Sequence, residues 1–216
     1  MGKHASRIDK LIRQVIICLF LVVGIFGLVY SYKCIRSQSI YAKVKYGVTC
    51  PLFLKPSITA SQELWDLHDI ANTIYPHNYY LNSYVAREAI ELAKASTNNP
   101  DISFEEFNLL ARKALFYSKL AVDVNPYDEE SRFMYQEALV LNGKIQEAVE
   151  YWEKIVDLEY WNSANHVIMA ELYLKSNNIS LAVGELPHLP NSELKTKLLK
   201  YKKLFDRRAK SNNLNK

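Results

Sequence analysis

The sequence predicts an all-helical protein in which a membrane-spanning helix is followed by a domain of antiparallel helix pairs. Three observations carry this prediction. The nineteen residues from Gln14 to Tyr32 are uncharged and mostly apolar, small residues recur every thirty-four residues in the second half of the chain, and only 6 of the 216 residues are glycine. These glycines form neither of the Gly-rich motifs that cradle phosphate groups, which argues against a nucleotide-binding α/β enzyme.

The formal net charge of +4 conceals three segments of alternating sign. Residues 1–60 carry nine Lys and Arg against one acidic residue, residues 61–192 carry nine against twenty, and residues 193–216 carry nine against two. A basic pI often accompanies nucleic-acid binding, but the positive charge then lies on the folded domain. Because the middle segment is acidic here, we expect no nucleic-acid partner.

Residues 14–32 are expected to form a single transmembrane helix behind a short basic tail, residues 1–13. At 1.5 Å per residue this helix reaches ~28 Å, which matches a hydrocarbon core of ~30 Å. Lys33 and Arg36 follow it, with Tyr30 just inside, as interfacial anchors do. A cleavable signal peptide is the alternative, but no small-residue cleavage site follows the apolar run.

Basic residues are equally frequent on the two sides of the predicted helix, so the positive-inside rule does not set its orientation. The short N-terminal tail has nothing to fold and is most simply left in the cytoplasm. We therefore expect a single-pass inner-membrane protein with a cytoplasmic N-terminus and a C-terminal domain in the periplasm.

Residues 33–60 are expected to form an extended juxtamembrane linker. From Ile40 to Cys50 apolar and polar residues alternate with a period of two, as in a short strand or an extended contact segment. Cys34 and Cys50 both follow the membrane helix, and an oxidising compartment would let them form a disulfide. Two unpaired thiols are the equal alternative, because sequence does not show their geometry.

The thirty-four-residue repeat lies within residues 61–191. Small residues that recur at such an interval mark the crossing of paired helices. The matching positions are Ala114, Ala148 and Ala182, with Tyr135, Leu139, Gly143 and Trp152 in one unit and Met169, Ala170, Tyr173, Asn177 and Leu186 in the next. On these residues the domain resembles the tetratricopeptide repeat (TPR) family, whose unit is a pair of antiparallel helices. The resemblance implies a TPR-like α-solenoid.

Local signals place the ends of two further helices. Ser103 and Glu106 form a capping box ahead of a long helix that ends at Val124, shortly before a proline. Residues 192–216 are expected to form a basic capping helix and tail. An apolar stripe on this helix would cover the end of the repeat stack: Leu194, Leu198, Tyr201 and Phe205.

The TPR resemblance implies a groove lined by the first helix of each pair. In that register the partner-binding residues are Glu130, Phe133, Glu137 and Val140 in one unit and Val167, Glu171 and Leu174 in the next. Apolar rows beside stacked carboxylates would suit an amphipathic helix or an extended peptide that carries Lys or Arg. The alternative is that some of these side chains pack within the repeats and that both central glutamates are only solvated.

The sequence gives little support to an enzyme. Its five histidines form no short metal-ligand motif, and its three cysteines lie in or beside the predicted membrane helix. No serine has the context of a nucleophile elbow. We therefore expect no catalytic residue, metal, cofactor or small-molecule substrate.

The expected function is recognition, by a membrane-anchored TPR scaffold or adaptor within a membrane or envelope assembly. Its partners would be other proteins of the membrane complex, bound at the groove or the juxtamembrane segment, together with membrane lipid. Ala121–Ala148 is similar to repeats of O-antigen ligase-type membrane proteins, and the plan resembles bacterial TPR proteins of secretion or envelope-polysaccharide assembly. The alternative is a structural accessory subunit that stabilises a large membrane enzyme complex through its transmembrane helix and juxtamembrane segment.

Overall fold

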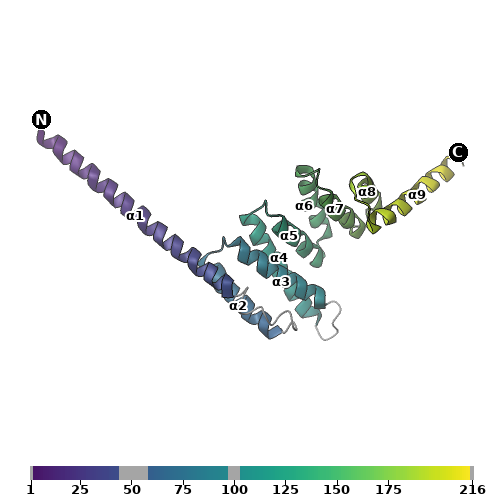
Figure 1. Ribbon diagram of the computed structural model, residues 1–216, viewed down its shortest axis with the longest axis horizontal. Helices are drawn as coiled ribbons and strands as arrows, with labels where there is room; N and C mark the ends of the chain where they lie inside the picture. The colour runs from purple at the N-terminus through teal and green to yellow at the C-terminus, as the bar shows by residue number, and fades with distance from the viewer. Residues whose placement is uncertain (1, 44–57, 97–102, 215–216) are drawn as a thin grey trace. The chain divides into compact units, whose positions relative to one another are not determined.

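All the secondary structure is helical in the computed structural model, which describes residues 2–43, 58–96 and 103–214 (Figure 1). The prediction of an all-helical protein is confirmed. In chain order the elements are α1 (Gly2–Lys43), α2 (Ile58–Ile74), α3 (Tyr79–Ser96), α4 (Phe104–Val124), α5 (Glu129–Leu141), α6 (Ile145–Leu158), α7 (Ser163–Lys175), α8 (Ile179–Gly184), the 3-10 helix η2 (Leu186–His188) and α9 (Glu193–Leu214).

The chain divides into two compact units. Unit 1 comprises Met1–Val85 and Lys119–Tyr127, and unit 2 comprises Ala86–Ser118 and Asp128–Lys216. Helices α1 and α2 belong to unit 1, α5 to α9 belong to unit 2, and α3 and α4 contribute to both. The division between units therefore falls inside the predicted repeat domain.

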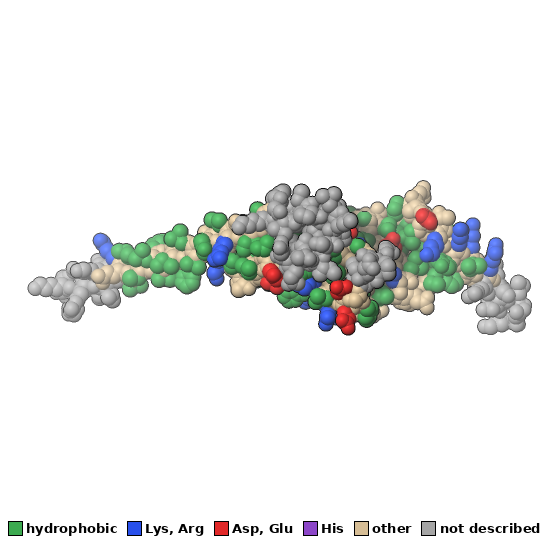
Figure 2. All heavy atoms as spheres, turned by 90° about the horizontal axis from the view of Figure 1, so that it is seen from below, with side chains coloured by type: hydrophobic (Ala, Val, Ile, Leu, Met, Phe, Trp, Pro, Cys, Tyr) green, Lys and Arg blue, Asp and Glu red, His purple; other side chains and the backbone are tan. Residues whose placement is uncertain are grey.

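Helix α1 contains the predicted transmembrane segment. Its stretch Ile12–Ile40 is long and apolar enough to cross a membrane, and a signal sequence near an N-terminus would satisfy the same criteria. The large apolar side chains from Val15 to Val29 are exposed. Figure 2 shows them as a hydrophobic stretch between Lys and Arg side chains. A helix that is apolar on all sides requires an apolar environment, so α1 is a candidate membrane span.

Helix α1 also continues beyond the expected span, to Lys43. Residues 33–43 are therefore helical, whereas the sequence predicted an extended linker there. No Gly or Pro interrupts this stretch, so nothing in it ends the helix. The remainder of the predicted strand lies outside the described residues, and so does Cys50. Cys34 is half-buried on α1, and its disulfide with Cys50 stays a prediction.

The predicted capping box opens α4. The backbone N–H of Ser103 donates to Glu106 Oε2 at 2.8 Å, and the N–H of Glu106 donates to Ser103 Oγ at 3.2 Å. The helix then ends at Val124, as the sequence predicted. Asp128 caps the next helix, α5, by accepting a hydrogen bond from the N–H of Ser131 at 2.8 Å. Both helix starts thus follow from short polar side chains at the N-cap position.

The repeat interval reappears in the backbone of unit 2. Gly143 and Asn177, which are thirty-four residues apart, both have positive φ, at 71° and 61°. In each turn the N–H of the following residue donates to the carbonyl five residues before it, at 2.9 Å after Gly143 and at 2.7 Å after Asn177. A left-handed residue at a helix C-terminus favours Gly or Asn, which explains this pair of residues.

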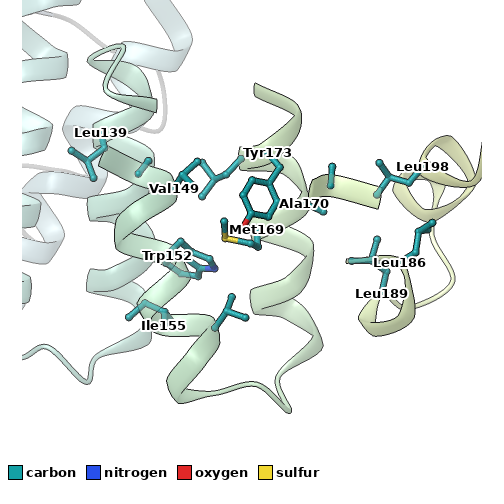
Figure 3. Packing of buried hydrophobic residues seen from close by; sticks show 14 residues of the cluster. Leu139, Val149, Trp152, Ile155, Met169, Ala170, Tyr173, Leu186, Leu189 and Leu198 are labelled. Carbon is teal, nitrogen blue, oxygen red and sulfur yellow. The ribbon is translucent and has the colours of Figure 1, made fainter. Parts of the chain in front are cut away.

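The core of unit 2 joins helices α5 to α9. Figure 3 shows Trp152 of α6 directed towards Met169 and Tyr173 of α7. The buried members of this core cluster are Leu139, Ala148, Val149, Trp152, Ile155, Val156, Met169, Ala170, Leu172, Tyr173, Ala182, Leu186, Leu189 and Leu198. The repeated alanines on α6 and α8 are completely buried, so they allow close approach of neighbouring helices.

Helix α9 covers the C-terminal end of this cluster. Leu198 is fully buried in it, and Leu194 and Tyr201 pack against it. Phe205, the last residue of the predicted apolar stripe, is 38% exposed. The first three residues of the stripe therefore pack as the sequence predicted, whereas Phe205 lies beyond the edge of the core.

Candidate partner-binding groove

A groove of about 510 Å³ lies on unit 2, where the start of α5 meets α6 and α7. The side chains that line it come from these three helices. They are Asp128, Glu129, Glu130 and Phe133 beside or on α5, Trp152 on α6, and Asn165 and Ile168 on α7. The groove thus combines aromatic and aliphatic groups with carboxylates and one amide.

Apolar side chains form the floor of the groove. Trp152 is 1% exposed, Ile168 is half-buried and Phe133 is 39% exposed. The indole N–H of Trp152 donates to the backbone carbonyl of Asn165 at 3.1 Å. This hydrogen bond holds the indole ring between α6 and α7, so the floor is preformed.

A partly buried ion pair joins α5 to the end of α6 beside the groove, and a hydrogen bond extends it to α7. Arg132 Nη1 donates to Glu159 Oε1 at 2.7 Å, and the amide of Asn165 donates to Glu159 Oε2 at 3.1 Å. Arg132 is 6% exposed. The hydrogen bond from Arg132 lowers the pKa of the Glu159 carboxyl, which is therefore ionised at neutral pH.

The entrance of the groove is acidic. The carboxylate of Asp128 is engaged by the N-terminus of α5, whereas Glu129 and Glu130 are exposed. Glu130 forms an ion pair with Arg87 of α3, in which both side chains are about half exposed and are therefore screened by water. Among the described residues Glu129 has no ion-pair partner, so it can bind a cation from another molecule.

Two of the predicted groove residues, Glu130 and Phe133, line the groove, and the others lie elsewhere. Val140, Val167 and Leu174 pack against the core cluster of unit 2, as the packing alternative supposes.

The two central glutamates of the predicted groove have different environments. Both carboxylate oxygens of Glu137 accept hydrogen bonds from Lys94 Nζ of α3 at 2.9 Å, whereas Glu171 is exposed on α7. One of the two carboxylates is therefore already paired with a lysine of the same unit, and the other faces solvent.

The sequence did not indicate that Asn165 and Ile168 line the groove. Each step along an α-helix turns the side chain by about 100°, so an error of one position in the register exchanges Val167 for Ile168. Helix α7 carries apolar residues at four successive positions from 167 to 170. Its sequence therefore does not reveal which apolar side chain faces the core and which faces the groove.

A second cavity, of about 240 Å³, lies in unit 2 among α6, α7, α8 and η2. In its wall His166 is 2% exposed, with Nδ1 at 2.7 Å from Glu185 Oε2 and Nε2 at 2.8 Å from the carbonyl oxygen of Tyr160. Because a carbonyl only accepts, Nε2 donates to Tyr160. The imidazole of His188 stacks on His166 with ring centres 4.3 Å apart.

Further hydrogen bonds join other polar groups in the wall of the second cavity. Tyr160 hydroxyl lies 2.9 Å from His188 Nε2, and Tyr173 hydroxyl donates to Glu153 at 3.0 Å. Burial raises the pKa of Tyr173 to about 12, and the hydrogen bond to Glu153 contributes to this rise. The residues that make these contacts are separated by up to thirty-five positions in the sequence, so no local sequence motif predicts them.

Within the described ranges, no three His, Cys, Asp or Glu side chains gather as a metal ion requires. The polar groups of the second cavity instead bind one another, and they tie α7 to the segment that follows α8.

Comparisons with known proteins give no assignment. No protein-family model matches the chain, and no curated protein matches it either.

Proposed function

We propose that this protein is a membrane-anchored helical-repeat adaptor, TPR-like in plan, that binds a segment of a partner protein in the groove of unit 2. The partner segment is an amphipathic helix or extended peptide with apolar side chains and at least one Lys or Arg. The observation that carries the proposal is the groove itself. It has a preformed apolar floor around Trp152 and an acidic entrance at Glu129.

The floor suits an apolar anchor because its side chains are held in place before binding. Trp152 is fixed by its hydrogen bond to Asn165 and Phe133 stays partly exposed. Aromatic residues in well-packed pockets are the usual centres of binding free energy at protein interfaces. A partner's leucine or aromatic side chain placed there would contact Phe133 and the floor at Trp152.

The entrance selects the charge of the partner. Glu129 is exposed and Glu130 is only partly neutralised by Arg87. Complementary charge steers encounter and rejects acidic partners more than it adds affinity. We therefore expect binding that weakens with salt, since the carboxylates lie at the solvent-exposed edge.

The proposed anchor is α1, in a single-pass arrangement with unit 2 on the periplasmic side of an inner membrane. Its apolar side chains are exposed along the candidate span Ile12–Ile40. Restriction to one membrane raises the effective concentration of the groove towards other membrane proteins. A charged residue at the centre of the span costs about 2.5–3.5 kcal/mol of insertion free energy, so the pair of changes Val22→Asp and Phe26→Asp should release the full chain from membranes.

A photo-crosslinking experiment tests the groove. The full-length chain, expressed in bacterial cells, would carry p-benzoylphenylalanine at Phe133, with Phe116 as the matched control. Phe116 is a phenylalanine of α4 that is 55% exposed and lies outside the groove. We expect a protein adduct at position 133 but none at position 116, and a weaker adduct when Glu129→Lys reverses the charge of the entrance.

Two outcomes contradict the groove. Equal adducts at both positions would indicate a surface without a specific site. Adducts confined to a crosslinker placed at Val22 on α1 would favour the structural accessory subunit, which engages its complex through the membrane helix.

Topology has its own test. A cysteine at Glu171→Cys, which is exposed on α7, is placed in a chain whose native cysteines are replaced by alanine. An impermeant maleimide should label it in intact cells, as a periplasmic unit 2 requires. Labelling only after the cells are opened would reverse the proposed orientation and leave the groove proposal standing.

A further inference from the structure

The turn between α2 and α3 is held against the side of α1. The hydroxyls of Tyr30 and Tyr75 are 2.8 Å apart, and their rings meet edge to face with centres 5.6 Å apart. One step further along α1, the amide of Asn78 donates to Ser37 Oγ at 2.9 Å, and both of these side chains are buried. All four residues belong to unit 1. This turn, residues 75–80, therefore has a fixed height along the candidate membrane helix.

That height coincides with the boundary of the hydrocarbon core. Tyr30 lies at the end of the uncharged run that precedes Lys33. Ser37 lies about 10 Å further along the helix axis, whereas a headgroup layer is about 5–8 Å thick on each side of the bilayer. The turn thus begins at the hydrocarbon edge, at Tyr30, and reaches just past the headgroups at Ser37.

The same turn exposes aromatic and amphipathic side chains. Tyr80 is 54% exposed, and on α1 the neighbouring Tyr30 and Tyr32 are 57% and 60% exposed. His77 is exposed as well, with its ring edge to face against Tyr75 at 5.9 Å. In Figure 1 the α2–α3 turn lies on the side of unit 1 that is nearer the N-terminus of α1, which is the side of the proposed bilayer.

We propose that the turn 75–80 is a second membrane contact, in which Tyr80 and His77 lie in the lipid headgroup layer beside the tyrosines of α1. Tyrosine is enriched at this depth because its ring is apolar and its hydroxyl can remain hydrated. The partner is the headgroup region of the same bilayer that α1 crosses. The inference rests on the proposed anchoring of α1.

This membrane contact would give the hydrogen bonds between α1 and the turn a function, which is to orient unit 1 on the bilayer. A single helix leaves the attached domain free to tilt about the point where it leaves the membrane. A second contact from the α2–α3 turn fixes the tilt of unit 1 relative to the bilayer, because Tyr80 lies on a different segment from Tyr30 and is tied to it through Tyr75.

Fluorescence quenching tests the proposal on the full chain in phosphatidylcholine vesicles. All native cysteines are replaced by alanine, and an environment-sensitive nitrobenzoxadiazole (NBD) dye is attached at Tyr80→Cys. Because Tyr80 is exposed, this change removes no core contact. We expect a blue-shifted emission that lipids with a headgroup nitroxide quench strongly.

Two reference positions distinguish the outcomes. Asp66→Cys, on the exposed face of α2 about 14 Å along the helix from Tyr75, should remain unquenched. Val22→Cys, near the centre of the uncharged run of α1, should be quenched by nitroxides on the acyl chains. If Val22 is not quenched, the anchor itself fails.

If Val22 is quenched while Tyr80 is not, the anchor stands and the second contact is wrong. The same conclusion follows if the dye at Tyr80 is shielded from water but insensitive to nitroxide lipids, since a protein surface would then cover the turn.

Discussion

The junction of α1 with the rest of unit 1 and the core of unit 2 hold helices together by different chemistry. At the junction α1 packs along α2, and hydrogen bonds between neutral side chains join it to the α2–α3 turn, Tyr30 with Tyr75 and Ser37 with Asn78. In unit 2 a continuous apolar cluster around Trp152 joins α5 to α9 (Figure 3). Hydrogen bonds are directional and add about 0.5–1.5 kcal/mol each, whereas burial of large apolar side chains adds more and imposes less geometry. The junction is thus suited to fix a position, and the cluster to supply stability.

The largest test of this comparison is Trp152→Ala. The indole is 1% exposed at the centre of the cluster, so its removal should lower the free energy of unfolding by about 3–5 kcal/mol. Chemical unfolding of the full chain in detergent, followed by helical circular dichroism, measures this loss. The matched variant Phe116→Ala, at a 55% exposed position, should change stability by no more than about 0.5 kcal/mol. Equal effects would show that the cluster is not the main source of stability.

A smaller effect is expected at the buried part of the junction. Asn78→Ala removes the donor to Ser37 and the acceptor of the Leu81 N–H at 3.3 Å, which caps α3. The loss should be about 1–3 kcal/mol, because a buried hydroxyl is left without its partner. A double-mutant cycle with Ser37→Ala separates the two roles. In the Ser37→Ala background, Asn78→Ala should still cost the free energy of the capping bond to Leu81, but no longer that of the bond to Ser37. Strict additivity of the two changes would contradict a direct contact.

The stability of unit 2 should also depend on pH, through the ion pair of Arg132 with Glu159. Arg132 lowers the pKa of Glu159 below its ordinary value of 4.5, so the folded state favours the ionised carboxylate. The resulting stabilisation is fully present above about pH 4.5 and is lost as the pH falls through the folded-state pKa. Unfolding experiments between neutral and acidic pH should show this loss, and Glu159→Gln should abolish that part of it. A Gln variant with the same pH profile would place the titration elsewhere.

The smallest effect is expected for Tyr75→Phe at the outer edge of the junction. It removes the hydroxyl that binds the exposed Tyr30 and also contacts Cys34, and should cost no more than about 1 kcal/mol. Amide hydrogen exchange in α2 would detect the change as faster local opening. Tyr30→Phe should give no larger an increase, and the double variant should add little to Tyr75→Phe alone.

Much of the helical plan could be predicted from the sequence because its signals are local. The capping box of Ser103 with Glu106 uses residues within one turn, and the positive φ of Gly143 and Asn177 suits these two residue types. The closing contact of Leu198 follows from the apolar stripe of its helix.

The candidate site was harder to predict because it depends on the rotation of helices about their axes. Val167 and Ile168 are chemically alike and both pack against the core cluster, and only the rotation of α7 determines that Ile168 also lines the groove. The pairing of Glu137 with Lys94 depends on the approach of two helices that are far apart in the sequence. The same holds for the pairing of His166 with Glu185, because no rule of sequence spacing predicts that these two side chains meet.

The uninterrupted course of α1 has a mechanical consequence. The helix continues from Gly2 to Lys43 without a break, and Tyr30 and Ser37 bind the α2–α3 turn along it. A helix without a proline or glycine kink beyond the bilayer transmits rotation about its axis. A partner that rotates the membrane segment about its axis would therefore rotate the α2–α3 turn of unit 1 through the same angle. The helix would then transmit rotation as well as anchor the chain.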